Sequence, residues 1–400
     1  NMISNKPSGT LTISLLLVIL FSYEIRAQIS TPPVGGSQKS KVNQWMGIAE
    51  VSVTYSSPGV ISPAGINRRG EIWGKRVPYG LSPERWLEND GEVVVPKPWR
   101  AGANENTVLT VSHDVMMEGK KLQAGAYGLF LIPGEKEWEL ILSNDSKSWG
   151  HYFYNDKNDA LRVKVIPEKS EYHEWLTYEF TDKKVDGSTL VLFWEDLKIN
   201  IHISVIDLHQ VYINQIKEEL ASRKLLYWYN WHEAANYCLN NSIELELGLR
   251  WAEKSIDQPY IGNANFATLK TKADILLALD RKQEADSVMQ FAMRYSGGVF
   301  ELHNYGRDLL EKKKLEEALK VFKLNAAKHP DYWVAQLGLA RAYGAQGDFK
   351  TALKYAYSAK KKIPKQELEI RQISLYVFID QLEKKQIPGN YLDNNLFQAY

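Results

Sequence analysis

Residues 99–105 bring several side chains that could bind a ligand into one short segment of the chain. Trp99 offers a flat aromatic face, Arg100 a guanidinium group and Glu105 a carboxylate. The intervening Ala and Gly residues allow a ligand or another strand to approach the backbone closely. One interpretation is therefore a polar pocket, with Arg100, Asn104 and Glu105 at its floor and Trp73, Tyr79 and Trp99 as its walls.

A structural corner is the alternative interpretation of the same segment. In that case Arg100 pairs with Glu105, Asn104 bonds to the backbone of the turn, and the aromatic residues belong to the core. Buried aromatic side chains and paired arginines are common structural features of folded domains. The sequence alone leaves both interpretations open.

The sequence carries no recognisable catalytic or metal-binding motif. It lacks Gly-x-Ser-x-Gly, a Walker-type phosphate loop and a dinucleotide-binding fingerprint. His113 and Asp114 are neighbours, so on a strand they would point to opposite faces, and residues 232–236 fall one ligand short of His-Glu-x-x-His. We therefore expect no metal and no cofactor, assign no catalytic residue and favour a non-enzymatic protein. A hydrolase that uses residues 100–105 is an alternative, although no partner can be chosen for the Glu105 carboxylate.

The charge of the chain is nearly balanced, with 49 Lys and Arg residues against 48 Asp and Glu residues. A nucleic-acid-binding domain usually carries a basic excess on one face. The lysine runs at 312–314 and 360–362 lie in helical segments, a pattern typical of a solvated helix face. We therefore expect no nucleic-acid partner.

The N-terminal segment, residues 1–27, resembles a secretory signal peptide. Lys6 supplies a positive charge, residues 11–21 are apolar but too few to cross a bilayer, and Ala27 is a small residue at a cleavage point. An uncleaved membrane anchor is the alternative. Residues 28–40 are rich in Pro, Gly and Ser and predict a flexible leader. We expect an exported protein, periplasmic or secreted, with no membrane contact beyond the signal peptide.

Cys238 is the only cysteine of the chain. An exported protein with a single cysteine has no internal disulfide, so burial alone must stabilise its domains. Because Cys238 lies in a helical pattern, we predict a buried side chain without a reactive role.

A period of two in the apolar residues predicts an all-β domain over residues 41–206, either a sandwich or a barrel. Ser82 followed by Pro83 resembles the start of a helix and predicts one short helix inside the connection 81–98. The predicted strands cover residues 51–55, 107–112, 126–132, 138–143, 161–165, 175–181, 189–194 and 199–205, with a hairpin turn at 133–136.

Residues 207–386 change to a helical period and contain an internal repeat. Pro330 and Pro364 are 34 residues apart, and small residues recur at matching places before each of them. This spacing resembles the tetratricopeptide repeat, in which small residues let two helices approach closely. Asp280 and Lys313 occupy the turn position where that repeat usually has Gly. A final helix over 366–386 is expected to cap the stack, and residues 387–400 form a tail.

The predicted β domain also contains a series of short motifs in a fixed order. They are Tyr-Ser-Ser-Pro-Gly-Val at 55–60, Ile-Trp-Gly at 72–74, Val-Pro-Tyr-Gly at 77–80, Trp-Arg-Ala-Gly-Ala-Asn-Glu at 99–105, Ala-Gly-Ala-Tyr-Gly-Leu-Phe at 124–130, Ile-Pro-Gly at 132–134 and Trp-Gly at 149–150. Over roughly residues 36–206 this series resembles an exported bacterial family, domain of unknown function 2911. The resemblance implies an exported β fold and no established activity. The segment 81–98 departs from the family, in which it is usually much shorter.

Three classes of function follow. The first is an exported cell-envelope binding or scaffolding protein whose helical repeats dock a protein or peptide partner on a concave surface. The second is a ligand-binding β domain with a saccharide as the favoured ligand, because eight of the twelve tryptophans precede residue 207 and flat aromatic rings stack on sugars. The third is the hydrolase named above.

Overall fold

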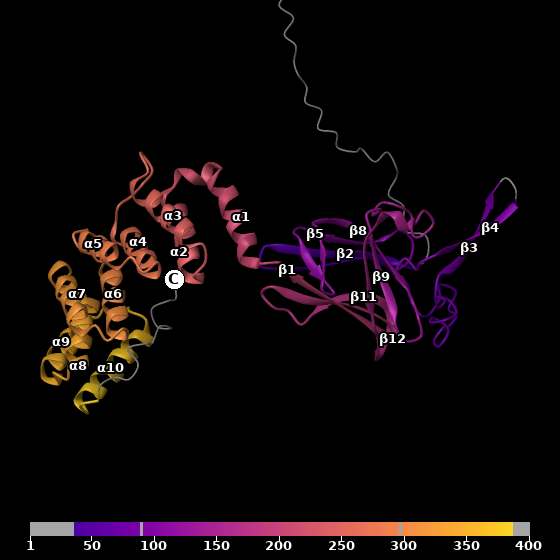
Figure 1. The fold of residues 1–400 in the computed structure, drawn as a ribbon. Helices are drawn as coiled ribbons and strands as arrows, with labels where there is room; N and C mark the ends of the chain where they lie inside the picture. Colours follow the sequence, from indigo (N-terminus) through magenta and orange to yellow (C-terminus); the bar gives the residue numbers. More distant parts are fainter. Residues whose placement is uncertain (1–35, 89–90, 296–297, 387–400) are drawn as a thin grey trace, which may run out of the picture. The chain divides into compact units, whose positions relative to one another are not determined.

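The computed structural model describes residues 36–88, 91–295 and 298–386 of the chain (Figure 1). The chain divides into two compact units, Asn1–Leu208 and His209–Tyr400. The described residues of the first unit form mainly strands, and those of the second form helices. Within the described residues, no helix is both long enough and apolar enough to cross a membrane.

The predictions for the two chain ends fall mostly outside the described residues. The predicted signal peptide (1–27) and the predicted tail (387–400) lie there entirely, and the predicted leader lies there up to residue 35. The leader predicted for residues 28–40 ends earlier than expected, because Gln38 already belongs to a strand and pairs with Ser57.

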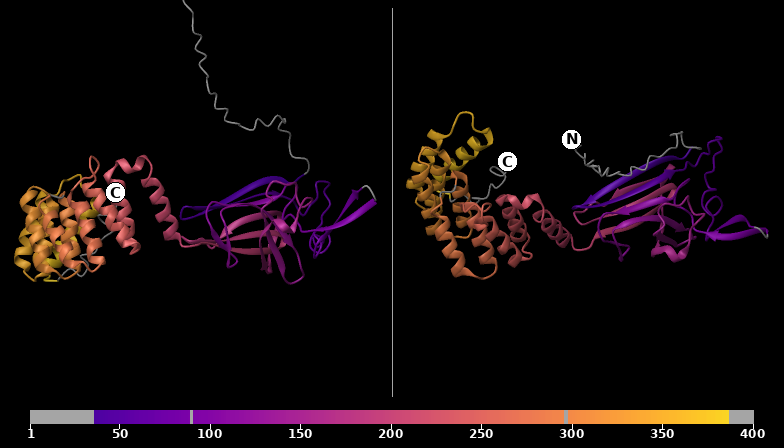
Figure 2. Two further views of the ribbon diagram at one scale, coloured as in Figure 1. Left: turned by 45° about the horizontal axis from the view of Figure 1, so that its top comes forward. Right: turned by 90° about the horizontal axis from the view of Figure 1, so that it is seen from above.

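The strands of the first unit form three antiparallel sheets (Figures 1 and 2). They are β1 (Gln38–Met46), β2 (Ala49–Ser57), β3 (Ser82–Glu88), β4 (Gly91–Lys97), β5 (Thr107–Val111), β6 (Val115–Met117), β7 (Lys120–Leu122), β8 (Gly125–Ile132), β9 (Trp138–Ser143), β10 (Asp159–Val165), β11 (Pro167–Thr181) and β12 (Gly187–Val205), with a short 3₁₀ helix, η1, at Asp156–Asn158. The largest sheet has the order β1-β2-β5-β8-β9-β10, and the second has the order β11-β12-β6-β7. The third is the hairpin β3-β4.

The inner faces of the two larger sheets share one core. Val51 and Val53 of β2 and Leu176 of β11 are fully buried. The rings of Tyr55 in β2 and Tyr178 in β11 meet with centroids 4.8 Å apart. Removing these apolar side chains from water stabilises the unit by roughly 25 cal/mol per Å². The all-β prediction is therefore confirmed, as sandwich-like sheets rather than a closed barrel within the described strands.

The short helix predicted inside residues 81–98 is wrong, because this segment forms the hairpin β3-β4. Pro83 lies opposite Pro96 in the register, which a two-stranded ribbon tolerates because each strand is an edge. The sequence contains the opposing signals, three β-branched valines at 93–95 and the turn-forming pair Asp90-Gly91. These signals outweigh the helix-start pattern at Ser82.

The strands predicted separately at 189–194 and 199–205 are parts of one strand, β12. Glu195 lies between them with a positive φ of 55°, and the pairing with β11 shifts register between His173 and Thr177. Such a bulge leaves a residue unpaired and increases the local twist. The bulge explains why the alternation of apolar and polar residues breaks at this point.

The segment that follows β2 connects the two larger sheets. The backbone N–H of Val60 donates to the carbonyl of Glu174 over 2.8 Å, and that of Leu176 donates to the carbonyl of Pro58 over 2.9 Å. Residues 58–60 thus leave the sheet of β2 and pair with β11 of the other sheet.

The helices of the second unit stack as consecutive pairs (Figures 1 and 2). They are α1 (Leu208–Leu220), a 3₁₀ helix η2 (Arg223–Leu226), α2 (Trp228–Asn241), α3 (Leu245–Asp257), α4 (Phe266–Ala278), α5 (Lys282–Ala292), α6 (Val299–Glu311), α7 (Leu315–Lys328), α8 (Trp333–Ala345), α9 (Phe349–Lys362) and α10 (Glu369–Glu383). The pairs are α2/α3, α4/α5, α6/α7 and α8/α9, and α10 packs on α9. The tetratricopeptide-like prediction is confirmed, including the final helix.

Small residues at the helix contacts set the spacing of the repeats. A Cβ atom at Gly306 of α6 would lie 2.5 Å from the Phe322 ring, and one at Gly338 of α8 would lie 2.3 Å from it. Real Cβ atoms do not approach other atoms so closely. Both glycines are therefore needed for the Phe322 ring, which belongs to α7, to fit between α6 and α8. The repeated alanines Ala273, Ala285, Ala292, Ala318, Ala352 and Ala359 are all buried as well.

Cys238 is fully buried in the core formed by α2 and its neighbours. Burial raises the pKa of its thiol to about 11, so the thiol is protonated at neutral pH. The prediction of a buried, unreactive cysteine agrees with this environment.

The turns inside three of the helix pairs use the same left-handed backbone conformation. The φ angles are 60° at Asp280, 58° at Lys313 and 81° at Gly347. Non-glycine residues adopt this conformation at a cost in free energy.

We predict that Lys313→Gly stabilises the helical unit by about 0.5–1 kcal/mol, since the relief of strain exceeds the added entropy of the unfolded chain. The converse variant, Gly347→Ala, is expected to cost about 1 kcal/mol from backbone strain alone, because no atom lies within 4 Å of the new Cβ. Urea unfolding followed by circular dichroism measures both changes. A loss of stability in Lys313→Gly would contradict the prediction.

The buried His303 predicts a pH dependence of the helical unit. Burial, and then the charges of Arg341 and Arg307, hold the pKa of His303 well below its usual range. In the unfolded chain the same imidazole gains a proton near pH 6.5. The unfolded state therefore binds more protons as the pH falls, and stability is lost below that value.

We expect His303 to lower the free energy of unfolding by about 1 kcal/mol between pH 6.5 and pH 5.5. His232, whose pKa burial also lowers, acts in the same direction. Chemical unfolding at the two pH values measures the change, and His303→Gln should flatten the dependence. Equal slopes in the two proteins would show that His303 is not the source.

Candidate functional site

The segment 99–105 is a tightly fixed corner of the β unit. Ala101 is fully buried with a φ of 49°, and Asn104 also has a positive φ, 58°. The carbonyl of Ala101 accepts hydrogen bonds from the Tyr178 hydroxyl at 2.9 Å and from Thr107 Oγ1 at 3.1 Å. This backbone is held by the core, as the structural interpretation of the segment requires.

Arg100 and Glu105 contact different partners. Arg100 Nη1 donates to the carbonyl of Asn104 over 2.6 Å, and its Nε donates to Nδ1 of the buried His151 over 3.3 Å. The guanidinium also lies 5.1 Å from the centre of the Tyr152 ring. The Arg100–Glu105 pair proposed for a structural corner is therefore replaced by an Arg100–His151 contact.

Glu105 bonds to residues of the first two strands. Its carboxylate accepts from Ser56 Oγ at 3.2 Å and lies 3.5 Å from Lys39 Nζ. Burial opposes its ionisation, but a backbone hydrogen bond and the charge of Lys39 outweigh burial and lower the pKa of the carboxyl. The Asn104 amide donates to the carbonyl of Ser37 over 3.4 Å. Arg100 and Glu105 thus bond to different parts of the domain.

The predicted walls Trp73 and Trp99 belong to a tryptophan cluster with Trp138 and Trp194. The Trp73 ring meets the other three edge-on at centroid distances of 4.9–5.7 Å, and Trp99 stacks on Trp194 at 5.9 Å. Edge-to-face and offset-stacked contacts are favourable packing for aromatic rings. Trp138 and Trp194 are buried, whereas Trp73 and Trp99 remain partly exposed. Tyr79, the third predicted wall, is exposed at the surface.

A pocket of about 550 Å³ lies beside this corner and is called here the β pocket. Ala103 is the residue of the 99–105 segment that lines it. The other lining residues are Gly36, Ser37, Pro58, Gly59, Ile61, Ser62, Pro63, Arg68, Glu174 and Trp175. The β pocket is built where residues 58–60 pair with β11, so its walls come from both sheets.

The polar groups of the β pocket are fixed by neighbouring groups. Arg68 donates from Nη2 to the carbonyl of Gly59 over 2.6 Å and from Nε to that of Val60 over 3.0 Å. Glu174 accepts from the Ile61 N–H at 2.8 Å and from the Tyr172 hydroxyl at 2.6 Å. The second bond raises the pKa of Tyr172, which keeps its proton for this contact.

The residues Arg68, Glu174 and Trp175 were missed by the sequence analysis. One signal was present for Trp175. The buried residues Leu176 and Tyr178 alternate along β11, so Trp175 must point to the outer face, where a large aromatic side chain is unusual.

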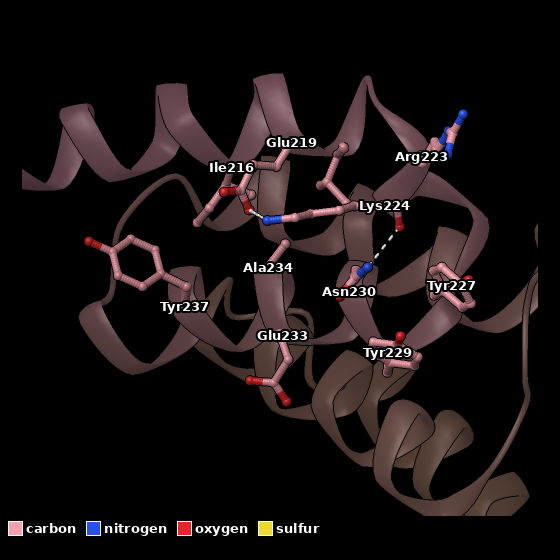
Figure 3. A pocket seen from close by; sticks show the side chains of 11 residues that line it. Ile216, Glu219, Arg223, Lys224, Tyr227, Tyr229, Asn230, Glu233, Ala234 and Tyr237 are labelled. Carbon is pink, nitrogen blue, oxygen red and sulfur yellow. Dashed lines mark hydrogen bonds and ion pairs between the residues drawn. The ribbon is translucent and has the colours of Figure 1, made fainter. Parts of the chain in front are cut away.

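The helical unit has a pocket of about 500 Å³ between α1, η2 and α2, called here the tyrosine pocket (Figure 3). Tyr227, Tyr229 and Tyr237 line it, and the rings of Tyr227 and Tyr229 stack at 5.4 Å. The remaining lining residues are Ile216, Glu219, Leu220, Arg223, Lys224, Asn230, Glu233 and Ala234. Tyr227 and Tyr229 keep 51% and 47% of their surface exposed, so aromatic area remains open for a ligand.

Two interactions hold the walls of the tyrosine pocket in place (Figure 3). The Lys224 amine forms an ion pair with Glu219 at 2.7 Å, and the Asn230 amide donates to the Lys224 carbonyl over 2.8 Å. Hydrogen bonds from Lys224 and then Gln215 lower the pKa of Glu219, so the carboxylate is ionised at neutral pH. The lining of the pocket therefore combines aromatic and apolar side chains with two acidic and two basic ones.

Residues 37–203 match the model of a family described as a protein of unknown function (DUF2911). The β domain belongs to this family. The match confirms the resemblance carried by the sequence motifs, and the description assigns no activity to the DUF2911 domain. No functionally curated protein matches the chain.

Two solved structures are similar to part of this chain. They are described as "MamA RS-1 ArsTM double mutant" and "MamA 41-end from Desulfovibrio magneticus RS-1". Each is 16% identical with a TM-score of 0.26; the matches cover 39% and 40% of this chain and 94% of each solved chain. Similarity at this level carries no argument about function.

The histidine motif of the helical unit, residues 232–236, is part of a hydrogen-bond network. His232 Nε2 lies 2.9 Å from Thr271 Oγ1, which donates to Asn236 Oδ1 over 2.9 Å. Within the described residues of both the DUF2911 domain and the helical unit, no group of three or more metal-ligating side chains gathers. The network instead connects α2 to α4.

We predict that Arg100→Ala and Glu105→Ala affect the DUF2911 domain unequally. Removing Arg100 takes away the donor to the part-buried carbonyl of Asn104 and the hydrogen bond to His151, which costs about 1–3 kcal/mol. Removing Glu105 breaks an exposed ion pair with Lys39 and one hydrogen bond from Ser56, and costs about 1 kcal/mol or less. Urea unfolding followed by tryptophan fluorescence measures both values. A larger effect for Glu105→Ala would contradict this assignment of the corner.

Proposed function

We propose that this protein is an exported binding protein of the cell envelope, and that its helical unit docks an extended segment of a partner protein in the tyrosine pocket. The observation that supports this proposal is the half-exposed Tyr227–Tyr229 pair that lines a preformed pocket. Tyrosine is enriched at binding hot spots because it offers a large, rigid contact area with a polar end.

The geometry favours a peptide over a charged small molecule. The ionic residues that line the pocket are Glu219 and Glu233 together with Arg223 and Lys224, so the pocket has no excess of one charge. Apolar side chains of an extended segment can pack on the aromatic lining residues, while the backbone of that segment can bond to the polar ones.

The proposal that the protein works in the envelope rests on the sequence. The segment 1–27 has the charged, apolar and small-residue regions of a signal peptide. A single cysteine is compatible with an oxidising compartment, since it has no second cysteine in the chain with which to form a disulfide.

The proposal is tested by affinity capture from an envelope extract of cells that carry the gene. Three full-length baits are compared: the wild type, the double variant Tyr227→Ala/Tyr229→Ala, and the control Tyr260→Ala. Tyr260 is fully exposed and lies outside the tyrosine pocket. We expect one partner whose recovery falls about tenfold or more with the double variant and is unchanged with the control.

Circular dichroism of each bait establishes that the helices are intact, as expected for substitutions of half-exposed side chains. The proposal is refuted if the double variant recovers the partner as well as the wild type does. It is also refuted if the wild type captures nothing above the background of an uncoated resin.

A further inference from the structure

The β pocket, in the β unit of the chain, is a second candidate ligand site. Three of its side chains indicate which class of ligand it could bind. Trp175 supplies an aromatic ring with 49% of its surface exposed. The ring lies against Gly59, where a Cβ atom would be only 3.0 Å from its Cζ3. The position of the ring is therefore fixed by the backbone while half of its surface faces solvent.

Arg68 and Glu174 provide opposite charges in the same pocket. A guanidinium has five N–H donors and a carboxylate about four acceptor positions, so the bonds to Gly59, Val60, Ile61 and Tyr172 use only part of their capacity. These bonds also hold both groups in place before a ligand arrives, which lowers the entropy lost on binding.

These groups together select a ligand. Because the two charges balance, the pocket favours a neutral molecule over an ion. That molecule must accept from a guanidinium and donate to a carboxylate, as hydroxyl groups do. It must also present an apolar face to Trp175 and to the walls made by Pro58, Ile61 and Pro63. A pyranose ring has both properties, since its C–H groups gather on one face and carry the partial positive charge that an aromatic face attracts.

We propose that the β pocket of the DUF2911 domain binds a neutral saccharide, with one sugar ring stacked on Trp175 and its hydroxyls bonded to Arg68 and Glu174. The volume of about 550 Å³ lies within the range of small-molecule sites, about 300–1,000 Å³. This site is separate from the tyrosine pocket, so either proposal can fail without the other.

Isothermal titration calorimetry of the full-length protein tests the proposal with three neutral probes: maltotriose, cellotriose and triacetylchitotriose. We expect at least one to bind with a Kd of about 1 mM or tighter. Trp175→Ala should weaken that binding about tenfold or more. Trp149→Ala is the matched control, because Trp149 is another half-exposed tryptophan of the same domain and does not line the β pocket.

Two further variants keep the test decisive if Trp175→Ala proves unstable. Trp175→Phe should retain part of the affinity, because a smaller aromatic face remains. Glu174→Gln keeps an acceptor for the Ile61 N–H but loses the carboxylate, and should weaken binding severalfold. The double variant Tyr227→Ala/Tyr229→Ala should bind the probe as the wild type does. The proposal is overturned if none of the three probes binds at about 10 mM, or if Trp149→Ala weakens binding as much as Trp175→Ala does.

Discussion

The backbone pairing of residues 58–60 with residues 174–176 ties the two sheets of the β unit together at one end. The strand β2 ends at Ser57, directly before this pairing begins. There the chain crosses to β11, and the carbonyls of Gly59 and Val60 become acceptors for Arg68. The corner at 99–105 depends on the same region, since the N–H of Ala103 donates to the carbonyl of Ser56 over 3.1 Å. The β pocket therefore brings together Pro58 and Ala103, which are 45 positions apart in the sequence.

In the helical unit, small residues determine how closely consecutive helices can approach. Gly306 and Gly338 accept the Phe322 ring between two helices, and alanines fill the comparable contacts elsewhere in the stack. Close packing of this kind fixes the orientation of each helix relative to the next. The pair α2/α3 is flanked by the 3₁₀ helix η2 and by α1, and there the packing leaves room for the tyrosine pocket. A cavity at the edge of a rigid stack has the preformed walls that favour binding.

Much of the fold could be predicted from periodicity alone. The strand prediction at 138–143 and the alanine spacing of the repeats, for example, depend only on which residues face the core. The hairpin β3-β4 could not be separated from a helix start, because Ser82-Pro83 is a local signal compatible with both. The residues of the candidate site could be predicted only with knowledge of the tertiary structure. Arg100 bonds to His151, 51 positions away, and Glu174 bonds to Ile61, 113 positions away. No local pattern identifies such partners, so the sequence located the corner and missed the pocket beside it.

The burial of Cys238 also makes the thiol a built-in reporter of chain opening. A protonated thiol with no exposed surface reacts with an alkylating reagent only after α2 separates from its neighbours. Its rate of labelling therefore measures how often this part of the stack opens, without an introduced probe and without interference from a second cysteine. A partner held in the tyrosine pocket, which α2 helps to form, would slow that labelling, so occupancy of the pocket could be followed through the chemistry of a single sulfur atom.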